Sequence, residues 1–436
     1  MSDALEYQTG FGNHLASEAV PGALPRRQSA PLEAPFGLIA EQLNGTGFTL
    51  RRRQNLRTWL YRLRPAVHDR GFALMDAPPP GFETRFHDAV SLPQVQRYKP
   101  VALPGGEVDW LDGVQTFAGA GDPSIKRGMA IHLYAASADM ERAFTNIDGD
   151  LLIAPERGRL RVQTELGWLE AAPGELLLLP RGIRFRVLLP DGVARGFAAE
   201  LYDGHFQLPE RGPVGANGLA DERHFRAPVA AYEDVAEDSV IIVKQGGRFW
   251  RTVAPNSPFD VVAWHGTYAP FVYDLADFMS MGSVSFDHPD PSILTVLTSP
   301  MDDHGRSAID VGVFRGRWDA TEHTFRPPYF HRNSAVEFNA VISTGAGAAD
   351  TGPYRPGVFT FTPYLTPHGV SARTQRGELE RGDDSPARIP DESLWLQFES
   401  TYTLEVLPRW LDGDALDAGF MENFKGWKLG SLTHDP

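Results

Sequence analysis

The chain of 436 residues contains no cysteine. It therefore has no disulfide, no thiolate nucleophile, no iron–sulfur cluster and no cysteine-ligated zinc. Any metal that this protein binds must be held by nitrogen and oxygen atoms. That requirement restricts the search for ligands to His, Asp and Glu, and the sequence offers 13 histidines.

Long apolar runs and concentrated positive charge are also missing. The longest apolar stretches are about as long as residues 176–179, far short of the ~18 residues that indicate a membrane helix. The first 13 residues have no basic region followed by an apolar run, so they do not predict a secretory signal. Net charge is −15 with scattered Lys and Arg, which argues against nucleic acid as a partner. We therefore expect a cytoplasmic protein with neither a membrane nor a nucleic-acid partner.

Regular structure is interrupted often along this chain. The 43 Gly and 35 Pro residues separate many short apolar segments, and helical periodicity is scarce. Short strands between turn residues are typical of an all-β sandwich or barrel. We expect strands at residues 150–153, 160–164, 176–179, 185–189, 239–243, 335–342 and 359–362, and the last strands between 393 and 407. Residues 1–100 are expected to be extended and rich in loops, residues 373–390 to be a surface excursion, and residues 411–424 to hold a short helix.

A weak internal repeat relates the middle of the chain to its C-terminal part. The segment from Gly174 to Phe185 and the segment from Gly357 to His368 have the same spacing between their first Gly, a Pro and the last residue. This spacing resembles the second motif of cupin β-barrels, whose last position is a metal-binding His. Upstream, the residues Phe144, Asn146, Asp150 and Gly158 match the spacing of His331, Asn333, Glu337 and Gly345. The repeat predicts a duplicated barrel in which the earlier copy, with Phe144, Asp150 and Phe185 in place of His331, Glu337 and His368, has lost its metal.

The three polar residues of the C-terminal copy suit one particular kind of metal site. His331 and Glu337 are six residues apart, so on an extended strand both side chains point to the same face. His368 arrives from a second segment, after a Thr-Pro turn. Two imidazoles and one carboxylate on a triangular face form the facial triad of non-haem Fe(II) oxygenases, which leaves positions open for substrate and O₂. The alternative is that these histidines are hydrogen-bonded structural residues whose order along the chain arose by chance.

Several segments resemble homogentisate 1,2-dioxygenase, the ring-cleaving enzyme of tyrosine and phenylalanine breakdown. The resemblance extends from about residue 6 to about residue 430. The segments that carry it are Gly10-Phe-Gly-Asn13, Pro21-Gly-Ala-Leu-Pro25, Ala40-Glu-Gln-Leu-Asn-Gly45, Trp59-Leu-Tyr-Arg62, Gly119-Ala-Gly-Asp122, Gly215-Ala-Asn-Gly-Leu-Ala220, Val262-Ala-Trp-His-Gly266, Phe286-Asp-His-Pro-Asp-Pro-Ser292 and Phe325-Arg-Pro-Pro-Tyr-Phe-His-Arg-Asn333.

The resemblance implies a fold and an assembly. The fold is mainly β, with a duplicated cupin-like barrel or sandwich architecture. Residues 1–280 are expected to form a β-rich N-terminal domain with a metal-free repeat, and residues 281–436 a catalytic cupin-like domain that binds iron. The assembly is a homo-hexamer built from two trimers.

The resemblance also implies the chemistry. His331, Glu337 and His368 fall on the family's Fe(II) ligands, His368 also lies against the substrate, and His288 falls on the catalytic base. A neutral His suits the removal of a proton from a ring hydroxyl, because its unperturbed pKa of ~6.5 is close to working pH. The reaction would be the O₂-dependent opening of homogentisate to maleylacetoacetate. Without the resemblance, the turn-rich sequence Asp-His-Pro-Asp-Pro favours a plain turn residue for His288.

Two positions depart from the family where substrate is recognised. Ala346 stands where the family has a substrate-contacting Tyr, and Thr362 where it has a His. Tyr354 or Arg355 could replace the lost contact, since Arg suits a carboxylate. A related hydroquinone or gentisate-like ring is therefore a second candidate substrate. A cupin-type metal isomerase or lyase and a non-enzymatic bicupin also remain open, although three intact ligands argue against the latter.

Overall fold

The computed structural model describes residues 4–215, 218–281, 290–301, 306–319, 322–326, 329–345, 353–382 and 385–431. Most of the regular structure in these ranges is β-strand, as the sequence predicted. The α-helices of this part of the chain are α1 (Trp110–Gly113) and α2 (Ala372–Arg381). Neither has the length and apolar character needed to cross a membrane.

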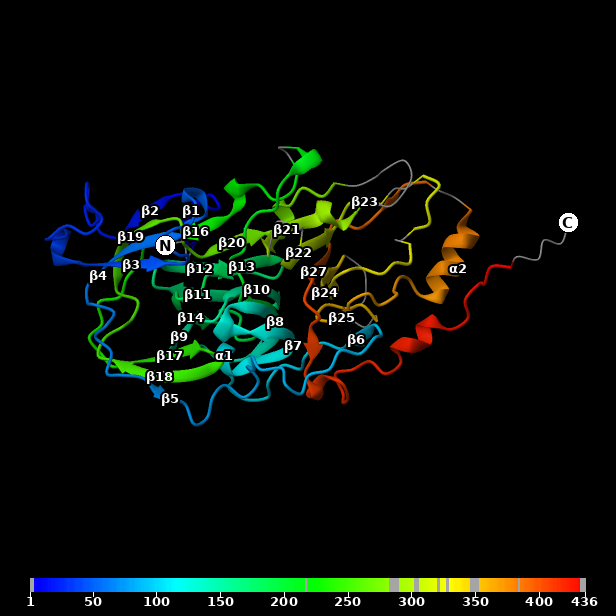
Figure 1. Ribbon diagram of the computed structural model, residues 1–436, viewed down its shortest axis with the longest axis horizontal. Coiled ribbons are helices and arrows are strands. Elements are labelled where there is room, and N and C mark those ends of the chain that lie inside the picture. Colours follow the sequence, from blue (N-terminus) through cyan, green and yellow to red (C-terminus); the bar gives the residue numbers. More distant parts are fainter. Residues whose placement is uncertain are drawn as a thin grey trace.

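Three sheets lie side by side as layers (Figure 1). The middle layer has nine strands, in the order β1 (Tyr7–Thr9), β16 (Arg226–Pro228), β20 (Phe271–Asp274), β13 (Glu175–Leu179), β10 (Asp150–Arg157), β15 (Ala194–Leu201), β8 (Arg127–Ala136), β7 (Val114–Asp122) and β28 (Glu405–Val406). One outer layer has seven: β12 (Gly167–Ala171), β11 (Leu160–Thr164), β14 (Arg184–Leu188), β9 (Ala143–Asn146), β17 (Ser239–Gln245), β18 (Arg248–Ala254) and β5 (Ala73–Leu74). The other has six: β21 (Thr295–Pro300), β22 (Ser307–Arg315), β27 (Ser393–Ser400), β24 (Val336–Thr344), β25 (Phe359–Thr362) and β6 (Gln96–Tyr98).

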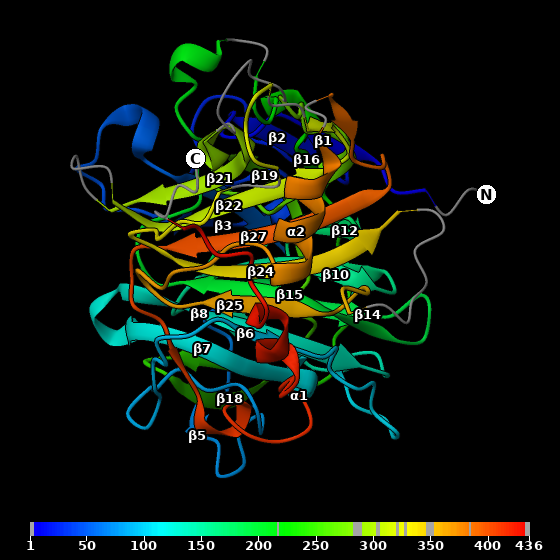
Figure 2. The same ribbon diagram turned by 90° about the vertical axis from the view of Figure 1, so that its right-hand side faces the viewer.

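Figure 2 shows the six-stranded layer from outside, with its strands one above the other from β21 to β6 and α2 standing in front of it. Two smaller sheets complete the part of the fold that the structure describes. One contains β2 (Leu15–Glu18), β19 (Val261–Gly266), β4 (Arg57–Arg62) and β3 (Ile39–Asn44), and the other contains β23 (Trp318–Asp319) and β26 (Ala387–Arg388).

Strand β10 shows why the nine-stranded sheet lies in the middle. Leu151 packs in one apolar cluster with Phe144 of the seven-stranded sheet. Its neighbour Leu152 belongs to a second cluster, together with Phe338 of the six-stranded sheet. Successive side chains of a strand point to opposite faces, so a strand buried on both faces is apolar without interruption. The unbroken leucines of β13 have the same cause, because they alternate between the same two clusters.

An aromatic layer joins the middle sheet to the six-stranded sheet. The ring of Phe338 on β24 lies 4.9 Å from that of Phe359, 5.7 Å from Phe197 and 5.8 Å from Phe117, measured between centroids. The side chain of Phe338 is fully buried. This layer fixes β24, the strand that carries Glu337, against the rest of the molecule.

The substitution Phe338→Ala should therefore destabilise the protein by about 3–5 kcal/mol, through lost burial and the cavity that it leaves. Guanidinium unfolding followed by tryptophan fluorescence measures the change. Phe48→Ala is the matched control, because Phe48 is 79% exposed and should cost little. A loss below about 1 kcal/mol for Phe338→Ala would show that the aromatic layer does not hold the two sheets together.

The two repeats have the same strand topology. The order β7-β8-β15-β10-β13 in the nine-stranded sheet is matched by β21-β22-β27-β24-β25 in the six-stranded sheet. Phe144 pairs with Phe185 in an antiparallel register, as His331 pairs with His368. The duplication predicted from spacing is therefore present in the fold, with two facing phenylalanines where the C-terminal copy has two facing histidines.

One correspondence of the repeat shifts by a residue. Glu337 pairs with Thr362 across β24 and β25, whereas Leu179, the counterpart of Thr362, pairs with Leu151. The strand register therefore aligns Glu337 with Leu151 and not with Asp150. Asp150 instead forms ion pairs with Arg181 at 2.9 Å and His205 at 2.8 Å.

The boundary predicted at residue 280 stays a prediction. The sheets exchange edge strands across it, because β6 from the N-terminal part completes the six-stranded sheet and β28 from the C-terminal part completes the nine-stranded sheet. The expected strands are all present as β10, β11, β13, β14, β17, β24 and β25. Residues 4–100 combine loops with the short strands β1 to β6.

Two local expectations hold in part. The described residues of the surface segment expected at 373–390 are mostly exposed, but the segment begins with helix α2, which Ser371 caps through the Thr374 amide and Gly382 ends in a left-handed conformation. The short helix expected at residues 411–424 is a 3₁₀ turn at Phe420–Phe424, and another 3₁₀ turn, Pro408–Trp410, precedes that range.

Candidate metal centre

The three predicted ligands come together at one end of β24. The backbones of His331 and His368 form an antiparallel bridge, each amide donating to the other's carbonyl at 3.0 Å. Glu337, the second residue of β24, places Oε1 3.0 Å from His368 Nε2 and 3.9 Å from His331 Nε2. One ligand atom from each of the three residues lies within 4.8 Å of the others. Cis ligands at ~2.1 Å from a metal are about 3 Å apart, so the cluster is close to coordinating geometry.

Both imidazoles are oriented by the same local hydrogen bond. His331 Nδ1 lies 2.8 Å from the carbonyl of Tyr329, and His368 Nδ1 lies 2.9 Å from the carbonyl of Thr366. A carbonyl only accepts, so each Nδ1 must carry the proton and each Nε2 presents a lone pair when the ring is neutral. His368 Nε2 is buried and has no hydrogen-bond partner among the described residues, although Glu337 Oε1 lies 3.0 Å away. A buried unpartnered nitrogen aimed at a carboxylate is the arrangement that a metal ion would complete.

Glu337 is held in place by two amides. Asn333 donates a hydrogen bond to Oε1, and Asn339 donates to Oε2 at 3.3 Å. Burial would raise the pKa of Glu337, but His368, Asn339 and His331 outweigh it and hold the pKa below its usual value. Burial likewise would lower the pKa of His368, and Glu337 instead raises it. The carboxylate is thus ionised and oriented toward the two rings.

Asn333 is a residue whose role the sequence analysis missed, although it stands in the quoted His-Arg-Asn motif. Asn333→Ala should lower metal affinity about 10- to 100-fold, because Glu337 loses the donor that fixes Oε1. Anaerobic titration with Fe(II) measures the affinity. Asn55→Ala is a suitable control, since the Asn55 amide bonds only to backbone far from Glu337. Unchanged affinity in Asn333→Ala would show that this amide does not position the ligand.

A row of polar residues crosses the outer face of the six-stranded sheet beside the triad. Glu337 pairs with Glu399 on β27, and Glu399 pairs with Asp310 on β22. Burial, followed by the charges of Glu337 and Asp310, raises the pKa of Glu399 to about 7. Glu399, Asp310 and Asp290 line a cavity of about 360 Å³. The sequence signal for this polar row is the alternation of apolar and polar residues in β27, where the buried Leu396 and Phe398 alternate with polar side chains.

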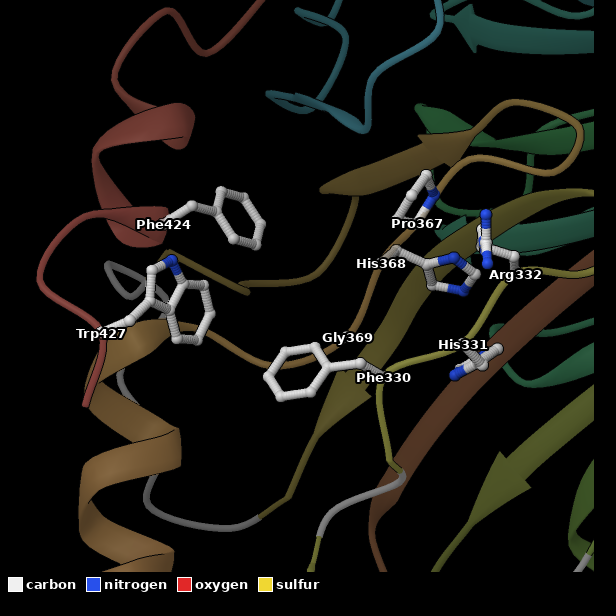
Figure 3. Close-up of a pocket in the computed structure, with 8 residues that line it drawn as sticks. All are labelled: Phe330, His331, Arg332, Pro367, His368, Gly369, Phe424 and Trp427. Carbon is white, nitrogen blue, oxygen red and sulfur yellow. The ribbon is translucent and has the colours of Figure 1, made fainter. Parts of the chain in front are cut away.

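A second cavity, of about 320 Å³, lies beside the two histidines (Figure 3). His331 and His368 lie at one end, and Phe330, Phe424 and Trp427 form an aromatic wall. The rings of Phe330 and Trp427 meet edge to face, with centroids 5.5 Å apart. Figure 3 also shows how closely Phe330 approaches Gly369; a Cβ at residue 369 would lie 2.5 Å from the Phe330 ring.

The C-terminal segment that carries this wall is tied to α2. Arg376 donates to the carbonyl of Gly426, and the side-chain amide of Gln375 exchanges two hydrogen bonds with the backbone of Lys428, at 3.2 and 3.3 Å. The aromatic wall is therefore attached to the body of the protein by its own helix.

The remaining predicted residues have different outcomes. His288 and Ala346 lie outside the described residues. Thr362 is buried and directly opposite Glu337. Tyr354 packs on Trp395, with ring centroids 5.3 Å apart. Its role as a replacement substrate contact, like that of Arg355, stays a prediction.

Comparison with known families matches almost the whole chain. A family described as "Homogentisate 1,2-dioxygenase N-terminal" matches residues 6–275. A second, described as "Homogentisate 1,2-dioxygenase C-terminal", matches residues 276–430. The second match contains His331, Glu337 and His368.

Solved structures give weaker similarities. Protein Ylba from E. coli is 10% identical, with a TM-score of 0.30 and coverage of 72% of this chain and 93% of that one. The putative glyoxylate-induced protein from Pseudomonas aeruginosa is also 10% identical at a TM-score of 0.30, covering 76% of this chain and 98% of that one. A cupin 2 conserved barrel domain protein from Leptotrichia buccalis is 10% identical at a TM-score of 0.27, covering 71% and 96%. At such values the fold assignment depends on the strands of this chain alone.

Proposed function

The chain belongs to the homogentisate 1,2-dioxygenase family, and from this membership we propose that it opens the aromatic ring of homogentisate with O₂ to give maleylacetoacetate. The observation that carries the proposal is the convergence of His331, Glu337 and His368 at the end of a cavity large enough for a small aromatic acid. A metal isomerase would use the same ligands, but membership of this family favours a dioxygenase.

We propose Fe(II) as the metal, held by His331, Glu337 and His368. Two imidazole nitrogens and one carboxylate suit this ion and leave open positions, and the orphaned His368 Nε2 fits a metal bond. Bound there, Fe(II) supplies the one-electron chemistry that O₂ requires to react with an aromatic ring. The chain's own contribution is to hold the three ligands on one side, through the paired histidine backbones and the amides on Glu337.

His288 is proposed as the base that removes the proton of a ring hydroxyl. Its neighbour two residues on, Asp290, lines the cavity beside Glu399. On this proposal a neutral imidazole accepts the proton of the ring hydroxyl.

A related hydroquinone or gentisate-like ring is the second candidate substrate. Thr362, where the family has a His, is buried and opposite Glu337, so a hydroxyl replaces an imidazole close to the metal ligands. A shorter side chain there leaves room for a ring with different substituents.

Oxygen uptake separates these candidates. The purified chain is loaded with Fe(II) under anaerobic conditions and mixed with O₂ and homogentisate, gentisate or hydroquinone in turn. We expect one O₂ to be consumed per homogentisate, with loss of the aromatic absorption, and little uptake with the other two. Uptake with gentisate alone would establish the second candidate. No uptake with any ring, despite one bound iron per chain, would refute the dioxygenase proposal.

The family resemblance further suggests a homo-hexamer made of two trimers. Light scattering coupled to size-exclusion chromatography tests it, since a 48.1 kDa chain and its hexamer differ sixfold in mass. The cytoplasmic location stays a prediction of the sequence.

A further inference from the structure

The described residues that line the cavity beside His331 and His368 include one arginine, Arg332, and an aromatic wall. Arg332 is exposed and lines this cavity together with His368 (Figure 3). Among the described residues that line the cavity, none is an Asp or a Glu. An aromatic acid would thus find apolar surface for its ring and a single positive charge for its carboxylate.

The guanidinium of Arg332 is not engaged within the described part of the protein, unlike those of several other arginines. Arg376 donates to a backbone carbonyl, Arg388 pairs with Asp391, and Arg97 pairs with Asp417 at 2.7 Å. No ion pair or hydrogen bond to a described residue involves the Arg332 side chain. A guanidinium presents a planar fork of donors that matches a carboxylate, and this fork is available for a ligand.

The cavity beside the Glu337–Glu399 strand pair is acidic. Glu399, Asp310 and Asp290 all line it. An anionic substituent that points into this cavity meets three acidic side chains and is repelled. The two cavities therefore differ in charge, and this difference can orient an asymmetric ring.

We propose that Arg332 binds the carboxylate of the substrate and so determines which way the ring lies at the metal. In this orientation the acidic arm points between Arg332 and the wall formed by Phe330 and Trp427, and the ring hydroxyls point toward the side of Glu399. The inference rests on the proposed function in so far as that function supplies an aromatic acid as the substrate. It makes Arg332 a specificity-determining residue, which distinguishes homogentisate from the same ring without a carboxylate.

Equilibrium binding without O₂ tests the inference. The Fe(II)-loaded chain is titrated anaerobically, by calorimetry, with homogentisate and with methylhydroquinone, which keeps both hydroxyls and has no carboxylate. Arg332→Gln should weaken homogentisate roughly tenfold, the size expected for one solvent-accessible charged contact, and leave methylhydroquinone within about twofold. Arg332→Lys should lie between the wild type and Arg332→Gln for homogentisate, because a lysine keeps the charge and loses the fork.

Arg53→Gln is the control for the change in net charge, since Arg53 is exposed and lies in the loop before β4. Iron content, measured before each titration, should be the same in all variants. Unchanged homogentisate affinity in Arg332→Gln, or an equal loss for both ligands, would overturn the inference, as would a wild type that shows no preference for homogentisate. A wild type that prefers homogentisate but consumes no O₂ would refute the proposed function alone, and the effect of Arg332→Gln on binding would still decide the role of Arg332.

Discussion

The variant His331→Ala is expected to fold and to lose its iron, together with all oxygen uptake. The His331 side chain is 28% exposed, so its removal costs little core packing. Its backbone bridge to His368 can still form with Ala at position 331, because Ala keeps the backbone N–H and carbonyl. What is lost is one of three metal bonds, and the fall in affinity should exceed the ~10- to 100-fold typical of residues that only support a ligand.

Metal analysis after anaerobic loading measures this loss, and oxygen uptake with homogentisate follows it. His68→Ala provides the matched control, because His68 is an exposed histidine in the loop after β4. Both variants should unfold at the temperature of the unloaded wild type. One iron per chain in His331→Ala, bound as tightly as in the wild type, would mean that the metal is held elsewhere.

Much of this site could be predicted from the sequence because the relevant spacing is local. His331 and Glu337 were placed on one face by assuming a continuous strand, yet β24 begins only at Val336. The chain bends between them, and this bend brings the side-chain amide of Asn333 within hydrogen-bond distance of Glu337. The prediction of proximity was right, although its geometric reason was incomplete.

What the sequence could not show depends on pairing between distant strands. Glu399 lies next to Glu337 only because β27 pairs with β24, across 62 positions of the chain. Trp427 reaches the cavity because the C-terminal segment returns to α2. The one-residue shift that aligns Glu337 with Leu151 likewise follows from strand register, which equal spacing does not determine.

The three-layer arrangement was also beyond the sequence pattern, for a related reason. Continuous apolar segments such as residues 176–179 indicate a strand buried on both faces, but they do not say which sheets cover it.

Helix α2 is different, because its signals are local. Ser371 before the helix and Gly382 after it are ordinary capping residues, and greater weight on them would have predicted the helix.

The substitution His288→Gln should separate metal binding from catalysis. We expect one Fe(II) per chain with unchanged affinity, since three other residues hold the metal, and a fall in kcat of about 10²- to 10⁴-fold, the usual contribution of a positioned base. Stopped-flow measurement of ring loss tests the fall in kcat. His87→Gln, at an exposed histidine of another cavity, should retain the wild-type kcat. Full activity in His288→Gln would show that His288 is not the base. Loss of iron in the same variant would show that His288 is a metal ligand.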